Sequence, residues 1–173
     1  MGEKVLITYA STAGSTEEIA YAISEVLFQA GMLVDHCKMR QVRVITTYRA
    51  VVLGTAIRRG KPLPEAMRFV SEHRVALRHV PVACFSAGVW MREDTPENRA
   101  KTEGFLAPLL AEIDQPVAVG CFAGKIDSGA LSRFWRWLAP RDDSGIHLHG
   151  DWRDWDKIQG WAQELAGILA ATG

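Results

Sequence analysis

Hydroxyl side chains crowd the turn that follows the first apolar run of the chain. This turn carries four of them, on Ser11, Thr12, Ser15 and Thr16, around a glycine at Gly14. An amphipathic stretch follows, so the free N–H groups of a helix start meet these hydroxyls in one place. Such donors bind a phosphate without supplying any positive charge. The turn therefore predicts an anion site.

The predicted binding residues of this first loop are Ser11, Thr12, Ala13, Gly14, Ser15 and Thr16. The lysine of a GxxxxGK[ST] loop is missing, which disfavours nucleoside triphosphates, and no GxGxxG run indicates a dinucleotide. A neutral donor set suits the single phosphate of flavin mononucleotide (FMN) better than a triphosphate. The alternative is a plain helix cap, although one hydroxyl would already satisfy a cap.

A second glycine-bearing loop is predicted at Gly54–Gly60, after another apolar run. We expect its two glycines to adopt positive φ and to let the backbone approach a flat ligand, with Thr55 at the edge of a heteroaromatic ring. Arg58 and Arg59 would bring positive charge, which near N1 of a reduced flavin raises its potential; solvated arginines are the alternative. The candidate binding residues here are Thr55, Ala56, Ile57 and Arg58.

A third candidate loop spans Ser86–Arg92. Trp90 is expected to cover one face of a planar cofactor, and ordinary burial of its indole is the alternative. Arg92 either faces an anionic substrate or is solvated. The candidate binding residues of this loop are Ser86, Ala87, Gly88, Val89 and Trp90.

Two later segments have unusual composition. Arg133–Trp137 combines two arginines with three aromatic residues. Such a patch docks anionic planar molecules or a membrane interface, whereas a core helix with snorkelling arginines is the plain alternative. His147 and His149 alternate like metal ligands, but no third ligand is evident, so no metal site is predicted.

The elements that position these loops alternate along the chain. The predicted strands are Val5–Tyr9, Leu33–Met39, Ala50–Gly54, Val80–Ser86 and Val117–Ala123. The predicted helices are Ser15–Ala30, one from Pro64, one from Pro96 that Gly104 and Pro108 interrupt, Ser128–Ala139, and one from Asp151. This alternation predicts an α/β fold with a parallel sheet of about five strands in the order 2-1-3-4-5, and a ligand at the carboxyl ends of the strands.

Helix boundaries and faces follow from local signals. Ser15 and Glu18 predict a capping box for the first helix, and Gly31 predicts its end. The apolar stripe expected on the first helix is Ile19, Ile23, Val26, Leu27 and Ala30. The stripe expected on the last helix is Trp155, Ile158, Trp161, Leu165 and Ile168.

The whole chain narrows the class of protein. Its 173 residues predict one domain over 1–173, and a formal net charge of zero disfavours nucleic acid as a partner. No apolar run is long enough to span a bilayer, and the early first strand leaves no room for a signal peptide. The three cysteines, Cys37, Cys84 and Cys121, are widely spaced and predict buried thiols rather than disulfides. We therefore expect a cytoplasmic protein.

These residues together resemble the flavodoxin-like family. Ser11–Thr16 matches the S/T-x-T-G-x-T signature of that family, with Ala13 replacing the middle hydroxyl. The resemblance implies a three-layer sandwich that binds FMN. Within the family the chain is similar to the menaquinone-dependent protoporphyrinogen oxidase branch, in which an inserted loop is linked to activity; the corresponding Val89–Lys101 is short and acidic here. Four stretches carry that likeness: Val52–Gly60, Ser86–Arg92, Arg133–Trp137 and Arg153–Ile158.

Three functions follow from the resemblance. The first is an FMN oxidoreductase of heme biosynthesis that oxidises a tetrapyrrole, protoporphyrinogen IX, with a quinone as acceptor. The second is a flavodoxin that carries electrons between redox-partner proteins, although such carriers are usually strongly acidic and this chain is neutral. The third is a flavin-binding domain without turnover. No catalytic acid or base is predicted, and a homo-oligomer and peripheral contact with the inner face of a membrane stay open.

Overall fold

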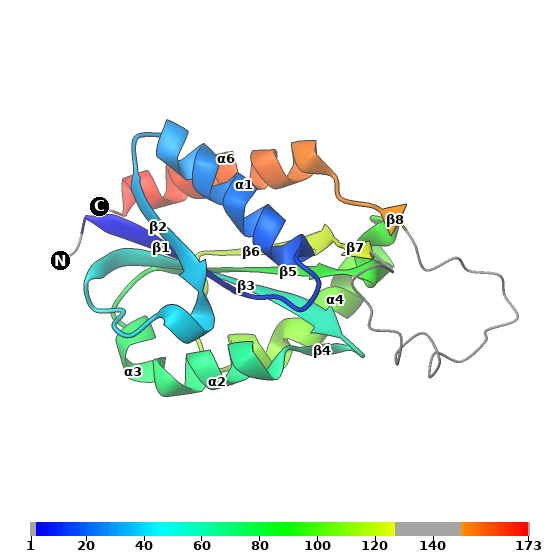
Figure 1. The fold of residues 1–173 in the computed structure, drawn as a ribbon, viewed down its shortest axis with the longest axis horizontal. Coiled ribbons are helices and arrows are strands. Elements are labelled where there is room, and N and C mark those ends of the chain that lie inside the picture. The colour runs from blue at the N-terminus through cyan, green and yellow to red at the C-terminus, as the bar shows by residue number, and fades with distance from the viewer. Residues whose placement is uncertain (1–2, 127–149, 173) are drawn as a thin grey trace, which may run out of the picture.

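A twisted parallel sheet forms the centre of the computed structural model, which describes residues 3–126 and 150–172. Its parallel strands are β1 (Lys4–Ala10), β2 (Leu33–Lys38), β3 (Tyr48–Arg58), β5 (Val82–Gly88) and β6 (Ala118–Ala123). Their order is β2-β1-β3-β5-β6, which confirms the predicted 2-1-3-4-5 arrangement (Figure 1). A sixth, short strand, β4 (Lys61–Pro62), pairs antiparallel with the end of β3.

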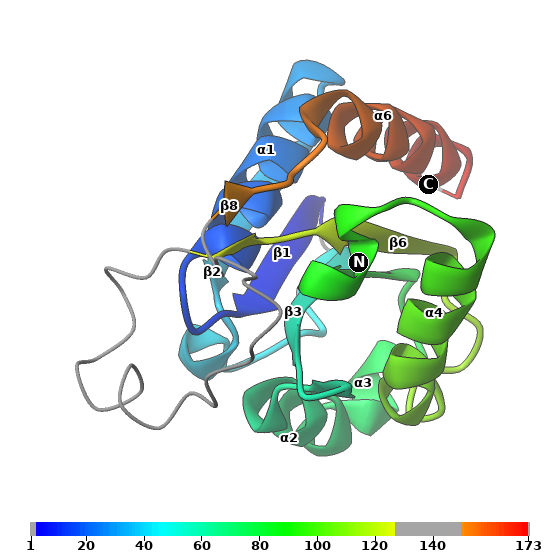
Figure 2. The ribbon, with the colours of Figure 1, turned by 90° about the vertical axis from the view of Figure 1, so that its right-hand side faces the viewer.

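Helices cover both faces of this sheet. The helices are α1 (Ser15–Gln29), α2 (Pro64–Glu72), α3 (Arg74–Leu77), α4 (Pro96–Leu110) and α6 (Trp155–Ala171). The shorter elements are the 3₁₀ turns η1 (Met39–Gln41) and η2 (Val89–Arg92), and the two-stranded ribbon of β7 (Lys125–Ile126) and β8 (Gly150–Asp151). Helices α1 and α6 lie on one face and α2, α3 and α4 on the other (Figures 1 and 2). Among the described helices, none is both long and apolar enough to cross a membrane.

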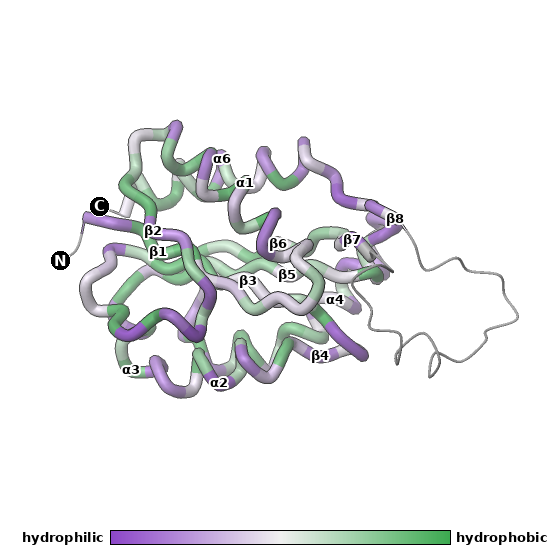
Figure 3. Tube along the Cα trace, viewed as in Figure 1, coloured by the Kyte–Doolittle hydropathy of each residue, from purple (hydrophilic) through white to green (hydrophobic). Residues whose placement is uncertain are grey.

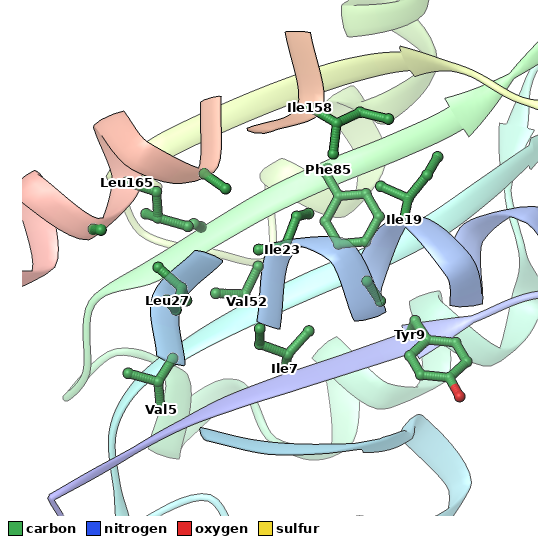
Figure 4. Close-up of a cluster of buried hydrophobic side chains, with 14 of the residues drawn as sticks. Val5, Ile7, Tyr9, Ile19, Ile23, Leu27, Val52, Phe85, Ile158 and Leu165 are labelled. Atoms are coloured by element: carbon green, nitrogen blue, oxygen red, sulfur yellow. The ribbon is translucent and has the colours of Figure 1, made fainter. Parts of the chain in front are cut away.

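The central strands are buried on both faces, as parallel strands between helices must be. They form the apolar centre of the molecule, while hydrophilic residues collect at the loops and the β4 hairpin (Figure 3). Successive residues of β1 point to opposite faces: Ile7 packs under α1 and α6, whereas Leu6 packs toward α2. Figure 4 shows the first of these clusters, in which Ile19 and Ile158 descend from the two helices onto Phe85.

The predicted start of α1 is wrong in its cap. Gly14, not Ser15, occupies the N-cap position, with φ of 87°, and no side chain of the described residues caps the helix. Ser15 is already helical, and the Glu18 carboxylate pairs with Arg153 instead of closing a capping box. The predicted end is confirmed, because Gly31 has φ of 86° directly after the last turn.

The later helices depart from prediction in several places. The last one, α6, begins at Trp155 rather than at Asp151, which belongs to β8, and the Trp155 side chain of its expected apolar stripe is exposed. Helix α4 begins at Pro96 as expected, with Asn98 N–H donating to Thr95 Oγ1 at 3.1 Å, but it continues through Gly104 and Pro108. The proline costs one backbone bond near the helix end, where burial of the leucines of the last turns holds the helix on the sheet. In α6, Ile168 is 37% exposed and Leu169 is buried in its place.

The loop predicted at Gly54–Gly60 is wrong, because β3 runs to Arg58 and turns only at Arg59 and Gly60. Gly60 does adopt positive φ, at 73°, but Gly54 does not. A Cβ built on Gly54 would lie 2.2 Å from Cζ of Phe85 on the neighbouring strand. Gly54 is therefore required by core packing rather than by a turn.

Gly54→Ala tests this packing role. We expect it to lower the free energy of unfolding by about 1–3 kcal/mol, since the new methyl displaces the buried Phe85 ring. Gly104→Ala, within α4, is the matched control: a Cβ there meets nothing within 4 Å, and the change should stabilise the protein by roughly 0.5–1 kcal/mol. Urea denaturation measures both, and equal stability of the two variants would contradict the assignment.

Candidate functional site

The first loop joins β1 to α1 at the carboxyl edge of the sheet. Its fold is fixed locally, because Gly14 N–H donates to Ser11 Oγ at 3.0 Å and Gly14 takes the left-handed conformation. The first intrahelical bond runs from Glu18 N–H to Gly14 O at 3.0 Å. The preceding N–H groups have no side-chain cap in the described part of the chain, so this helix end presents free donors.

Thr16 provides the strongest sign of a ligand at this helix end. Its side chain is 1% exposed, and Oγ1 has no hydrogen-bond partner among the described residues. A buried hydroxyl without a partner costs about 1–3 kcal/mol, which a bound acceptor would recover. A phosphate oxygen at the start of α1 is such an acceptor, so these residues fit the phosphate of FMN.

The first loop also meets the ends of β5 and β6. Ser15 Oγ lies 3.3 Å from the position that a Cβ on Gly124 would occupy, and Gly124 N–H donates to Gly88 O at 3.2 Å. A side chain larger than glycine at 124 would therefore crowd the serine. The structure thus brings Ser15 and Gly88, predicted from separate loops, to one place.

A pocket of about 690 Å³ opens beside the first loop. Ser11 and Thr12 line it on one side, and the β3–β4 hairpin lines it on the other with Arg58, Arg59 and Lys61. The predicted positive charge of this crevice is thus present. Sequence reasoning missed Lys61 because it placed the end of the loop at Gly60. The rest of the lining is Pro62, Leu63, Pro64 and Glu65.

The predicted role of the Thr55 side chain does not fit its surroundings. The hydroxyl donates to Ala56 O at 3.0 Å and accepts from Leu63 N–H at 3.2 Å, and the side chain is buried. It anchors the hairpin to α2, and Thr55 itself is paired in the sheet between Ala10 and Ser86. Ile57 packs beside Gly88, and a Cβ built on Gly88 would lie 3.3 Å from the Cβ of Ile57.

The third candidate loop divides between two elements. Ser86, Ala87 and Gly88 end β5, and Val89 and Trp90 belong to η2. Lys101 Nζ lies 4.0 Å from the Trp90 ring centroid, and the Phe105 ring is 5.8 Å away, so α4 covers part of the indole. Trp90 is still 39% exposed, and its uncovered surface is what a planar cofactor would meet.

Both acidic residues in the first turn of α1 have partners. Tyr9 Oη donates to Glu17 Oε1 at 2.7 Å, and burial together with this carboxylate raises the pKa of Tyr9, which keeps the phenol protonated. Glu18 pairs with Arg153, a residue that sequence reasoning placed only in a motif. Arg153 also binds Asp151 and lowers the pKa of that carboxyl.

The other features predicted from the sequence do not contribute to this candidate site. Arg133–Trp137, His147 and His149 lie outside the described residues. Within residues 3–126 and 150–172, no three His, Cys, Asp or Glu side chains are grouped to hold a metal ion. Cys84 and Cys121 are buried free thiols, and Cys37 is half-buried.

The strand order defines a doubly wound α/β protein, and its first strand–helix turn leads into a helix start without a side-chain cap from the described residues. The profile of the family described as "Flavodoxin domain" matches residues 6–138, well over half of the chain. The chain therefore belongs to the flavodoxin domain family, whose cofactor is FMN and whose members transfer electrons.

Curated relatives include both carriers and enzymes. "Probable flavodoxin 1" of Bacillus subtilis is 35% identical over 89 residues, which cover 49% of this chain and 56% of that protein. Protoporphyrinogen IX dehydrogenase (quinone) of Escherichia coli K12 is 28% identical over 175 aligned positions, covering 95% of this chain and 96% of the enzyme. A protein of the same description from Leishmania major is 29% identical, and the match covers 71% of this chain and 54% of that protein.

Solved structures agree on the fold. An archaeal flavodoxin superposes with a TM-score of 0.59 at 17% identity, over 96% of this chain and 99% of that one. Rubredoxin oxygen:oxidoreductase of Desulfovibrio gigas superposes with a TM-score of 0.58 at 19% identity, over 98% of this chain and 37% of that one. Identities this low establish a shared architecture only.

Thr16→Val tests the phosphate site. We expect the Kd for FMN to rise roughly 10- to 100-fold, because one hydrogen bond to a charged oxygen is lost, while the stability of the FMN-free protein stays equal or improves. Flavin fluorescence and thermal melting measure the two effects. Thr102→Val is the control: Thr102 is equally buried but donates to Asn98 O at 2.8 Å, so its loss should affect stability and leave FMN affinity unchanged. Unchanged affinity in Thr16→Val would contradict the site.

Proposed function

We propose that the chain is an FMN-dependent oxidoreductase that oxidises protoporphyrinogen IX and delivers the electrons to a quinone. The observation that carries this proposal is the pocket that Arg58, Arg59 and Lys61 line beside the first loop. It is supported by the match to protoporphyrinogen IX dehydrogenase over nearly the full length of both chains.

The chemistry of the pocket suits this substrate class. A porphyrinogen presents carboxylates on an apolar macrocycle, and the pocket pairs three cationic side chains with an apolar wall formed by Pro62, Leu63 and Pro64. Cations bind the carboxylates and the wall accepts the ring. In each oxidation step the porphyrinogen loses two electrons and two protons, and the quinone gains both to become a quinol.

Three groups of residues would hold FMN in this proposal. The first loop, Ser11–Thr16, binds the phosphate through N–H groups and the Thr16 hydroxyl. The segments Thr55–Arg58 and Ser86–Val89, together with the open surface of Trp90, would hold the flavin ring. When bound, FMN supplies the redox chemistry, and the protein orients it and tunes its potential.

Anaerobic reduction tests the proposal directly. The purified chain is loaded with FMN and mixed with protoporphyrinogen IX, and the visible absorbance of oxidised flavin is followed; menadione is then added. We expect bleaching by the porphyrinogen and recovery with the quinone. Absence of bleaching in protein fully loaded with FMN would contradict the proposed oxidation of protoporphyrinogen IX.

Lys61→Ala tests the pocket. We expect KM for the porphyrinogen to rise roughly three- to tenfold, about 0.7–1.4 kcal/mol, with kcat unchanged, because a carboxylate contact is lost in ground state and transition state alike. Lys4→Ala is the control, since Lys4 pairs with Asp35 at 3.0 Å at the opposite edge of the sheet. Equal KM values for both variants would exclude Lys61 from the substrate site.

The second candidate is an electron-transferring flavodoxin that serves a redox-partner protein. The match to "Probable flavodoxin 1" favours it, although that match covers about half of this chain. Redox titration separates the candidates: a carrier has a very low, well-separated hydroquinone couple and no quinone reductase activity. For the enzyme, we propose a cytoplasmic protein that contacts the inner face of a membrane peripherally.

A further inference from the structure

Arg153 is a cation that joins the segment before α6 to the first turn of α1. Its side chain is only 4% exposed. It holds Asp151 through two bonds, Nε to Oδ1 at 2.7 Å and a terminal nitrogen to Oδ2 at 2.5 Å, and its other terminal nitrogen pairs with Glu18. Its guanidinium also lies 4.6 Å from the ring centroid of Trp155. Four contacts thus fix this arginine beside the start of α1.

The negative charge of Glu18 is unfavourable for phosphate binding at the start of α1. Glu18 lies in the first turn of α1, where its backbone N–H donates to Gly14 O at 3.0 Å. Acidic side chains there stabilise a bare helix start, but they repel an anion that uses the same donors. Glu17 in the same turn is held by Tyr9 and lies 3.7 Å from Lys38. Glu18 depends on Arg153 alone among the ion pairs of the described residues.

We propose that Arg153 is a positioning residue for the phosphate site, and that it acts by cancelling the charge of Glu18. The arginine thereby makes the site selective for a phosphorylated flavin over riboflavin. This inference rests on the proposed binding of the FMN phosphate at the first loop.

The charges of Arg153, Asp151 and Glu18 give an ordered expectation. In the native protein, these three side chains, one cation and two carboxylates, carry a combined charge of −1. Glu18→Gln makes this charge 0, Arg153→Met makes it −2, and the double variant returns it to −1. Affinity for the phosphate dianion should therefore be highest in Glu18→Gln, equal in the native protein and the double variant, and lowest in Arg153→Met.

The experiment titrates FMN and riboflavin into the full chain at low salt. We expect Arg153→Met to raise the Kd for FMN about tenfold, roughly 1.4 kcal/mol, and Glu18→Gln in the Arg153→Met background to restore it. Riboflavin should bind all variants within about twofold, and added salt should compress the differences for FMN. Arg99→Met is the matched control, because it removes the same charge from an exposed pair with Asp94 on the α4 side.

The outcomes separate this inference from the proposed function. If the native protein does not bind FMN, the phosphate site itself fails. If it binds FMN but Arg153→Met weakens FMN and riboflavin in parallel, or Glu18→Gln gives no rescue, the inference is wrong. If Arg153→Met does not fold by circular dichroism, Glu18→Gln alone decides: tighter FMN binding supports the inference and unchanged binding overturns it.

Discussion

The uncapped start of α1 is the constraint on which the site depends. Gly14 takes the N-cap position in a left-handed conformation and supplies no side chain to cap the first N–H groups of the helix. The Thr16 side chain is buried, and its hydroxyl has no hydrogen-bond partner within residues 3–126 and 150–172. This arrangement is unfavourable without a ligand, since buried donors lose water and gain nothing. The stability of the first turn and the affinity for a phosphate are therefore two aspects of one interaction.

Charge is divided between two ends of the site. At the phosphate end the protein offers neutral donors, and its two nearby carboxylates, Glu17 and Glu18, are held by other groups. At the pocket end, cationic side chains gather on the β3–β4 hairpin. A carboxylated substrate of the proposed kind would thus be attracted toward the hairpin rather than toward the first loop. That division suits an enzyme for carboxylated substrates better than a carrier that docks basic partners.

The sequence predicted what local patterns determine. Alternating apolar runs and amphipathic stretches indicated the strand order, and the hydroxyl-rich turn indicated the phosphate loop. Gly54 shows where such reasoning stops: a glycine needed for a turn and one needed for packing look alike, and its reason is Phe85 on another strand. The clamp between Arg153 and Glu18 joins residues 135 positions apart, so no local pattern reveals it. The apolar stripe of α6 includes Leu169 rather than the neighbouring Ile168. This one-residue shift corresponds to a rotation of the helix about its axis, which is determined by packing.

Similarity to other proteins supports different conclusions for the first loop and for the pocket. The first loop would hold a phosphate through backbone donors and a glycine conformation, which persist as side chains diverge; an archaeal flavodoxin at 17% identity keeps the fold. The pocket would bind a substrate through the side chains of Arg58, Arg59 and Lys61, which lie on the β3–β4 hairpin. Loops there change more readily than the sheet that carries them. The cofactor follows from membership of the flavodoxin domain family, whereas the substrate has to be argued from this chain's own charges.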